Sequence, residues 1–244
     1  MLADVELEVA DGPLALLGPS GAGKSLVLRC LLGLAPPRSS VRGELFLNEG
    51  RVRLGDARAV ARLRGRGLCL LPQAAAASLD PVRRVEAQLR ELLALHGNRE
   101  DEPGELLRLV GLPDLLRRYP HELSGGQAQR VALALALACR PAVLLADEPS
   151  SALDNVAQAQ LLELLRARCE ARGAKLVLVS HDLALVSRVC RDAVVLDSGR
   201  VVEGGPLARL IAAPVHPVTR ALVVAARRAD AVFVGDEPVL EARS

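Results

Sequence analysis

Aromatic residues are almost missing from this sequence, which has no tryptophan, one tyrosine and two phenylalanines among 244 residues. An excess of charge of one sign is missing too, because acidic and basic side chains are interspersed and leave a formal net charge of only +2. A surface that binds nucleic acid usually carries a dense basic patch with aromatic side chains among the basic ones. Since the sequence has neither, we expect no nucleic-acid partner.

The sequence also lacks cysteine pairs and long apolar runs. Its five cysteines are scattered without a Cys-x-x-Cys pair, which favours small buried side chains in a reducing compartment over a disulfide or metal framework. The longest apolar run, Val131–Cys139, is too short to cross a bilayer. Asp4, Glu6 and Glu8 interrupt the apolar start that a signal peptide needs. We therefore expect a soluble, cytoplasmic protein that could serve a membrane only from outside the lipid.

Apolar residues, in contrast, make up 50% of the chain, which is enough for one large α/β domain. Short apolar runs alternate with segments of helical periodicity, and this order predicts a largely parallel sheet with right-handed crossovers. The segment GELFLNEGRVRL predicts a hairpin that turns at Asn48-Glu49-Gly50. The expected strands are residues 3–18, 67–73, 142–148, 174–180 and 192–205, and the expected helices between them are residues 24–34, 156–172 and 183–191.

Residues 74–141 differ from the rest, because they carry helical periodicity broken by glycine and proline and contain no strand candidate. This pattern predicts a helical subdomain inserted into the α/β domain. The expected organisation is a core with a small β subdomain in residues 1–73 and 142–204, the helical subdomain in 74–141, and a short helical extension in 205–244.

The octapeptide GPSGAGKS, between an apolar strand and a helix, fits the phosphate-loop pattern G-x-x-x-x-G-K-[ST]. Its glycines let backbone N–H groups surround phosphate oxygens, Lys24 adds a positive charge near the β- and γ-phosphates, and the Ser25 hydroxyl can ligate Mg²⁺. An ordinary glycine-rich turn is the alternative, but the flanking strand and helix favour a phosphate site. The candidate binding residues are Gly18, Pro19, Ser20, Gly21, Ala22, Gly23, Lys24 and Ser25.

A second acidic motif, AVLLADEP, matches this loop. Four apolar residues predict a buried strand, at whose carboxyl end Asp147 can hold Mg²⁺ through water. Glu148 then stands where a general base could polarise the water that attacks the γ-phosphate. Acidic residues often end strands, so the motif gains its meaning from its pairing with the phosphate loop.

The stretch LSGGQ opens a long helical pattern with a serine and two glycines, which is how a chain forms an anion site at a helix N-terminus. A solvated glycine cap is the alternative interpretation. A complete phosphate loop already precedes it in the chain, so the residues alone leave open what this second site binds. Its residues are Ser124, Gly125, Gly126 and Gln127.

In this order the phosphate loop, LSGGQ, the strand ending ADEP, and SALD resemble the ATP-binding-cassette (ABC) ATPases over nearly the whole chain. The resemblance implies one ABC ATPase domain in residues 1–244, an α/β fold with a RecA-like P-loop core, a small antiparallel β subdomain and an inserted helical signature subdomain. It implies ATP and Mg²⁺ as cofactors. It also implies two ATP molecules between two head-to-tail subunits, so that the helix starting near Ser124 points at the partner's γ-phosphate.

The resemblance assigns roles to three further positions. Gln73 is expected to reach toward Mg²⁺ and the attacking water, and His181 to contact the γ-phosphate as a switch histidine. Taken singly, these two residues would be a loop glutamine and a structural histidine. The loop Ser151–Asp154 is expected to cross the dimer interface, with Asp154 linking the two sites. One feature departs from the family: no aromatic residue that could stack on adenine precedes Phe46.

A single cassette without membrane helices, zinc insertions or long coiled coils fits an importer best. The segments LPQAAAASLDPVRRV and APVHPVTRALVVAA resemble the peptide/nickel importer ATPases, and GKSLVLRCLLGLAPP and DNVAQAQLLELL look closest to the nickel-type member. This implies ATP-driven import of nickel, a nickel chelate or oligopeptides. The ATPase would lie at the cytoplasmic face of the inner membrane with a second ATPase chain, two permease subunits and, indirectly, a substrate-binding protein. The alternative is a soluble ABC-type ATP switch that regulates a partner outside transport.

Overall fold

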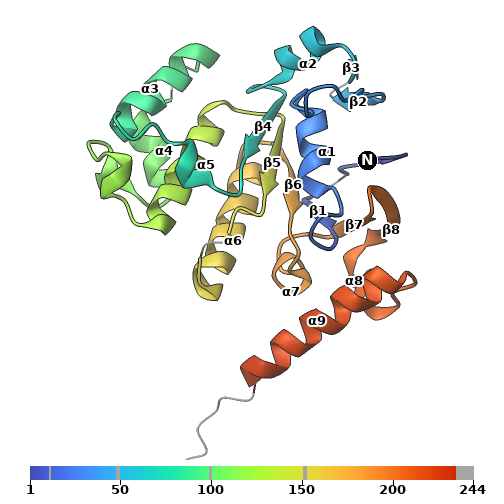
Figure 1. The fold of residues 1–244 in the computed structure, drawn as a ribbon. Coiled ribbons are helices and arrows are strands. Elements are labelled where there is room, and N and C mark those ends of the chain that lie inside the picture. Colours follow the sequence, from blue (N-terminus) through green and yellow to red (C-terminus); the bar gives the residue numbers. More distant parts are fainter. Residues whose placement is uncertain (11, 48–49, 99–100, 151–152, 235–244) are drawn as a thin grey trace, which may run out of the picture.

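The protein is described by a computed structural model in which residues 1–10, 12–47, 50–98, 101–150 and 153–234 are placed. Within these residues six strands form one sheet in the order β4-β5-β6-β1-β7-β8 (Figure 1). Neighbouring strands from β4 to β7 are parallel, and only β8 is antiparallel to its neighbour, which confirms the predicted largely parallel sheet. The strands are β1 (Leu14–Leu17), β4 (Leu68–Leu71), β5 (Val143–Asp147), β6 (Lys175–Val179), β7 (Asp192–Asp197) and β8 (Arg200–Pro206).

The central strands are buried on both faces, which explains their continuous apolar runs. All four residues of β1 are buried, and so are the first four of β5. One face of the sheet packs against α1 (Lys24–Leu31) through Val27 and Leu28. The other face packs against α5 (Gly125–Ala138) and α6 (Asn155–Ala171).

The first strand is shorter than the sequence suggested, because β1 begins at Leu14 and not at residue 3. Residues 5–9 do alternate as predicted: Val5, Leu7 and Val9 pack against the core, and Glu6 and Glu8 are exposed. This segment has no strand partner among the described residues. Alternation therefore identified which side chains face inward, but a strand also needs a neighbour to accept its backbone hydrogen bonds.

The helix after the phosphate loop ends at Leu31, three residues before the predicted Leu34. Gly33 adopts a left-handed φ of 64°, and the N–H of Leu34 donates to the carbonyl of Arg29 at 2.7 Å. This is the glycine-based helix ending called the Schellman motif, and it stops the helix before the prolines that follow.

A small hairpin and one further helix lie beside this core. The strands β2 (Glu44–Leu47) and β3 (Gly50–Arg53) pair antiparallel as predicted, while the expected turn residues 48–49 lie outside the described residues. The helix α2 (Ala57–Leu63) was not predicted. Its N-cap is Asp56, whose carboxylate accepts the N–H groups of Arg58 and Ala59, each at 3.0 Å.

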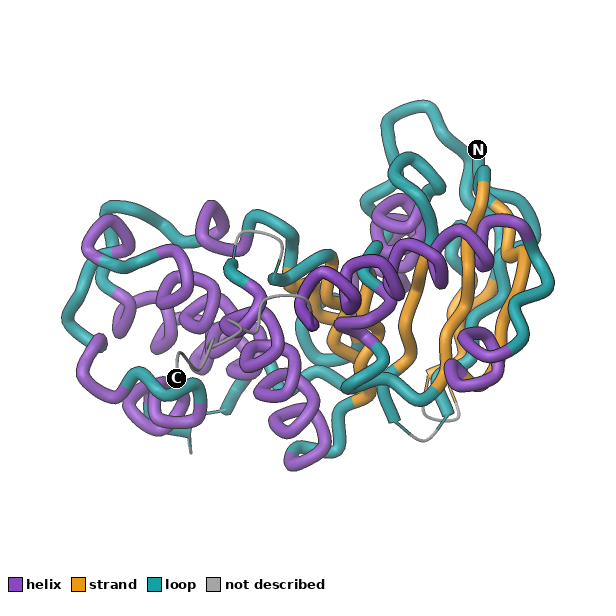
Figure 2. Tube along the Cα trace, turned by 90° about the horizontal axis from the view of Figure 1, so that it is seen from below, coloured by secondary structure: helices purple, strands orange, loops and turns teal. Residues whose placement is uncertain are grey.

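In the described part of residues 74–141 the structure is helical and contains no strand. The helices α3 (Val85–His96), α4 (Pro103–Leu109) and α5 pack against one another beyond the β4 edge of the sheet, on the left in Figures 1 and 2. Short 3₁₀ turns at 75–78, 113–115 and 120–122 connect them. The exact division into core, helical subdomain and extension remains a prediction.

The end of the chain differs from the prediction in two places. Residues 192–205, predicted as one strand signal, form the antiparallel pair β7–β8, with Ser198 at a left-handed φ of 47° in the turn. The helix α7 (Leu183–Val186) is shorter than the predicted 183–191. After the sheet come α8 (Leu207–Ala212), which packs on β7 and β8, and α9 (Pro217–Val234), which packs against α7 and β7 (Figure 1). Glu203 accepts the N–H groups of Val215 and His216 just before α9.

Candidate functional site

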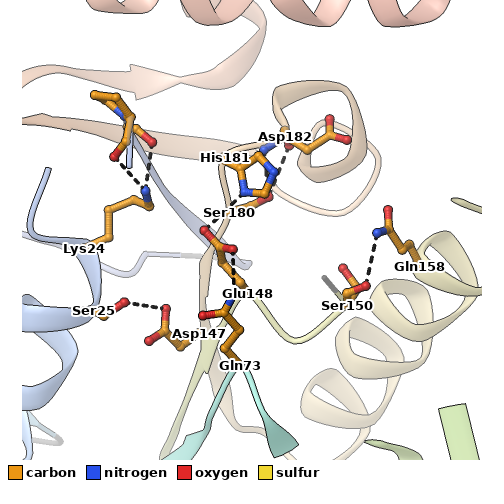
Figure 3. Close-up of polar contacts among 12 residues, drawn as sticks. Lys24, Ser25, Gln73, Asp147, Glu148, Ser150, Gln158, Ser180, His181 and Asp182 are labelled. Atoms are coloured by element: carbon orange, nitrogen blue, oxygen red, sulfur yellow. Dashed lines mark hydrogen bonds and ion pairs between the residues drawn. The ribbon is translucent and has the colours of Figure 1, made fainter. Parts of the chain in front are cut away.

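The predicted site residues come together at the carboxyl ends of the parallel strands, which share one edge of the sheet. The phosphate loop follows β1, Asp147 and Glu148 end β5, and His181 follows β6. Gln73 follows β4 after one intervening proline. Figure 3 shows these side chains directed toward one another.

The phosphate loop needs glycine at its first position for a steric reason. Gly18 has a φ of 150°, and a Cβ atom there would lie 2.2 Å from the carbonyl oxygen of Leu196. Gly23 has a φ of 104° and is the N-cap of α1. The loop can therefore turn from β1 into α1 in this tight space only with glycine at Gly18.

Lys24 lies inside the loop and is only 6% exposed. Its ammonium group donates to the carbonyl oxygens of Gly18 at 2.8 Å and Pro19 at 3.0 Å (Figure 3). Burial lowers the pKa of Lys24 below its ordinary value, and the nearby carboxylates of Glu148 and Asp147 oppose that effect. The loop thus holds a desolvated cation whose acceptors are neutral carbonyl groups, an arrangement suited to an incoming anion.

Ser25 and Asp147 join the loop to the acidic motif. The Ser25 hydroxyl donates to Oδ1 of Asp147 at 3.0 Å, although the residues belong to different elements. A hydroxyl and a carboxylate oxygen in contact are the hard oxygen donors that Mg²⁺ prefers. The residues therefore fit a Mg²⁺ ion, as the sequence predicted for Ser25 and Asp147.

Glu148 is held by two side chains. Nε2 of Gln73 donates to its Oε2 at 3.3 Å, and Nδ1 of His181 lies 3.2 Å from its Oε1. The Glu148 side chain is 19% exposed and that of His181 is 62% exposed, so the group opens to solvent on the histidine side. Glu148, Ser180 and His181 also border a cavity of about 50 Å³, which exceeds the roughly 10–15 Å³ that one water needs.

Two supporting residues escaped the sequence prediction. The Ser180 hydroxyl accepts the backbone N–H of Asp182 at 3.0 Å, and so fixes the turn that carries His181. Gln158 on α6 donates through Nε2 to the carbonyl of Ser150 at 3.1 Å and holds the chain just after Glu148. The tripeptide Ser-His-Asp after a strand could have indicated the contact of Ser180 with Asp182. No local pattern in the sequence indicates the contact of Gln158 with Ser150.

The residues of LSGGQ cap α5 and lie apart from this group. Ser124 and Gln127 form a capping box: the Ser124 hydroxyl accepts the N–H of Gln127 at 3.2 Å, and Oε1 of Gln127 accepts the N–H of Ser124 at 2.9 Å. No Cβ added at Gly125 would meet another atom within 4 Å. In the described part of the chain, no hydrogen bond or ion pair joins these residues to the phosphate loop.

Asp154 is likewise not brought to the phosphate loop. Its carboxylate caps α6 by accepting the N–H groups of Val156 and Ala157 at 3.1 and 2.9 Å. Ser151 and Ala152, the first half of the predicted interface loop, lie outside the described residues. The structure therefore gathers the predicted residues of the loop with Gln73, Asp147, Glu148 and His181, and leaves LSGGQ and Asp154 at separate positions.

A largely parallel sheet with a glycine loop, a buried lysine and two strand-end carboxylates at one edge defines a P-loop nucleoside-triphosphatase. The family model described as "ABC transporter" matches residues 2–151. The chain belongs to the ABC transporter family, and it is an ATPase.

Two curated relatives cover most of the chain. The dipeptide transport ATP-binding protein DppD of Haemophilus influenzae is 39% identical over 90% of this chain and 69% of its own length. The oligopeptide transport ATP-binding protein OppD of Lactococcus lactis subsp. cremoris is 34% identical over 90% of this chain and 68% of its own length.

Two solved structures have the same fold. The ATP-binding cassette MJ0796, in a dimeric post-hydrolysis state with ADP and phosphate, superposes with a TM-score of 0.68 at 27% identity, over 84% of this chain and 90% of that one. CbiO1 of Clostridium perfringens gives a TM-score of 0.69 at 24% identity, over 91% and 87% of the two chains, and supports the fold alone.

Among the described residues, no helix has the length and apolar character needed to cross a bilayer.

Proposed function

We propose that this chain hydrolyses ATP to power a peptide importer. The observation that carries the catalytic part is the convergence of Lys24 and the pairs Ser25–Asp147 and Gln73–Glu148 at one sheet edge. The peptide part rests on the relatives, whose names describe dipeptide and oligopeptide transport.

In the proposed reaction the phosphates of ATP enter the loop from Gly18 to Ser25. Lys24 then exchanges its two carbonyl acceptors for phosphate oxygens, and a buried ammonium gains more from a charged acceptor than from a neutral one. A Mg²⁺ ion bound with the nucleotide would neutralise phosphate charge, and Ser25 and Asp147 would hold it. The backbone N–H groups at the start of α1 add favourable partial charges.

Glu148 is proposed to take the proton of the attacking water. The carboxylate is already oriented by Gln73 and has His181 on its other oxygen. Gln73 would position the water, and His181, on the exposed side of Glu148, would contact the γ-phosphate. A positioned base of this kind contributes roughly 10²–10⁴-fold to a rate.

The remaining predicted residues are proposed to act across a dimer. Ser124, Gly125, Gly126 and Gln127 stand at the exposed start of α5, where helix N–H groups favour an anion. They would contact the γ-phosphate held by a second ATPase chain, and Asp154 would lie at the same interface. Two permease subunits, a substrate-binding protein acting through them, and a position at the cytoplasmic face of the cell membrane complete the proposed assembly.

Peptide is proposed as the cargo ahead of nickel. The segments that resemble the nickel-type member are GKSLVLRCLLGLAPP and DNVAQAQLLELL, which form the helices α1 and α6 with their flanks. The two relatives described above match 90% of this chain each, and their names describe dipeptide and oligopeptide transport ATP-binding proteins.

Uptake in cells tests the proposal. Deletion of the gene is expected to abolish uptake of a labelled dipeptide, and a Lys24→Ala copy is expected not to restore it. Loss of nickel uptake with normal dipeptide uptake would replace peptide by nickel as the cargo. If both uptakes persist while the purified chain still hydrolyses ATP, the peptide proposal and its nickel alternative are both wrong, and the ATPase assignment stands.

A further inference from the structure

Glu148 lies where the chain leaves β5, and its backbone needs support from its neighbours. Its φ of 44° is in the left-handed region, which a residue with a side chain keeps only when surrounding contacts hold it there. The next residue is Pro149, which has no N–H group to donate. The hydrogen bonds that hold this backbone therefore come from Glu148 itself and from the residues after the proline.

The backbone is held on both sides of Glu148. On one side, the N–H of Glu148 donates to the carbonyl of Val179 in β6 at 3.1 Å. On the other side, the carbonyl of Ser150 accepts the N–H of Leu153 at 3.0 Å and Nε2 of Gln158 at 3.1 Å (Figure 3). Ser150 is buried, so water is a poor substitute for a bond that is lost there.

Gln158 reaches Ser150 from a fixed part of α6. Its own N–H donates to the carbonyl of Asp154 at 2.8 Å, and the Asp154 carboxylate caps this end of the helix. Leu161 and Leu162, one turn further along, are buried in the core. Because the helix is anchored in this way, Ser150 cannot move away from α6 without breaking its bond to Gln158.

Packing alone does not fix this part of the chain. Glu148, Ser150, Gln158 and His181 all border the same cavity of about 50 Å³. A cavity leaves the backbone beside it room to shift, because the atoms that would otherwise block the movement are missing there. The position of Ser150 therefore depends on its hydrogen bonds.

We propose that Gln158 is a positioning residue for ATP hydrolysis, which acts through Glu148. Its bond to Ser150 keeps the strained backbone of Glu148 in place, and so keeps the carboxylate between Gln73 and His181. Without this bond the backbone relaxes toward a more common φ, and the carboxylate leaves the place where it takes the proton of the attacking water. The inference rests on the proposed role of Glu148 as the base.

Steady-state kinetics of the assembled transporter test the inference. Gln158→Met keeps the length of the side chain but removes the donor, and is expected to lower kcat roughly 5–10-fold, as the loss of one hydrogen bond would. The KM for ATP is expected to stay within about twofold, because the phosphate loop is unchanged. Gln158→Glu should lower kcat at least as much, since an ionised carboxylate cannot donate. Gln160→Met changes an exposed glutamine of the same helix and is the matched control with normal kcat.

A double-mutant cycle shows whether Gln158 acts through Glu148. In a Glu148→Gln background, Gln158→Met is expected to change the residual rate by less than about twofold, because the carboxylate that it positions is already gone. Equal fold losses in the two backgrounds would overturn the inference, and so would a raised KM with unchanged kcat. A kcat of Gln158→Met equal to that of Gln160→Met would overturn this inference alone. Normal turnover in Glu148→Gln would overturn the proposed base and this inference with it.

Discussion

At the scale of the residue, Glu148 combines backbone strain with unusually complete support. Its φ of 44° lies in the left-handed region, which is unfavourable for a residue with a side chain by about 1–3 kcal/mol. Its N–H donates to the carbonyl of Val179 at 3.1 Å, and Gln73 and His181 hold the carboxylate. These contacts hold the strained backbone of Glu148 in place, and its carboxylate lies between Gln73 and His181.

Replacing this carboxylate by an amide of the same shape tests its proposed role as base. Glu148→Gln is expected to bind ATP normally but to hydrolyse it at least about a hundredfold more slowly, since an amide cannot take a proton. Phosphate release by the assembled transporter measures this. Glu163→Gln, which changes an exposed glutamate on α6, is the matched control and should keep full turnover. Normal turnover in Glu148→Gln would exclude it as the base.

Lys24 predicts a pH dependence of nucleotide binding. Burial lowers the pKa of Lys24 below 10.5, the value of an ordinary lysine. As the pH rises, Lys24 in the nucleotide-free chain therefore loses its charge at a lower pH than an ordinary lysine does. Phosphate favours the charged form, so binding is expected to take up a proton in this alkaline range and the ATP affinity to fall as the pH rises through the lowered pKa. Calorimetry in buffers of different ionisation enthalpy measures the uptake. An affinity that stays constant up to pH 10.5 would contradict the assignment.

At the scale of the element, several helices begin at a side chain that accepts backbone N–H groups. Asp56 caps α2, Asp154 caps α6 and Asp182 caps α7. Asp154 has two possible roles, as the cap of α6 and as a charged residue at the proposed dimer interface. Replacing it by asparagine distinguishes them, because an asparagine can cap a helix but carries no charge.

Asp154→Ala is expected to destabilise the chain by about 1 kcal/mol and lower the Tm by roughly 2–4 °C, because two N–H groups lose their acceptor. Asp154→Asn should keep nearly the original Tm, and any loss of ATPase activity in that variant would then report the proposed interface role. Equal Tm values for Asp154→Ala and the unaltered chain would show that the cap contributes nothing.

The sequence allowed most of the core elements to be predicted but not their limits. Buried parallel strands have continuous apolar runs, so β5 and β6 were recognisable. The limits of β1 and α1 depended on tertiary pairing and on the left-handed Gly33, which periodicity does not report. The helix α2 was not predicted because it has only seven residues. An aspartate such as Asp56 occurs before turns as often as it caps a short helix.

The site was predictable where motifs sit at strand ends, because parallel strands bring their carboxyl ends to one edge. That rule explains why the phosphate loop, Asp147, Glu148 and His181 lie together, although His181 was expected only from the family resemblance. It could not reveal Gln158 beneath Ser150, since that contact depends on how α6 packs against the sheet.

At the scale of the whole molecule, the N-terminus of α5 lies apart from the phosphate loop of its own chain. Both the start of α5 and the start of α1 suit a phosphate group. A loop at the exposed start of a helix, with open space at Gly125, can be approached by a second subunit. The separation is what a head-to-tail pair of cassettes would need, and it makes the two loops testable independently.

Ser124→Arg is expected to leave nucleotide binding by its own chain nearly unchanged and to prevent ATP-dependent pairing, because the bulky cation fills the approach of the partner's phosphate. Size-exclusion chromatography with ATP, in a Glu148→Gln background and with the cognate second ATPase chain, measures the pairing. Ser124→Thr, which keeps a hydroxyl cap for the N–H of Gln127, is the matched control and should still pair. Pairing by Ser124→Arg as complete as that of the threonine variant would rule out a phosphate contact at this helix start.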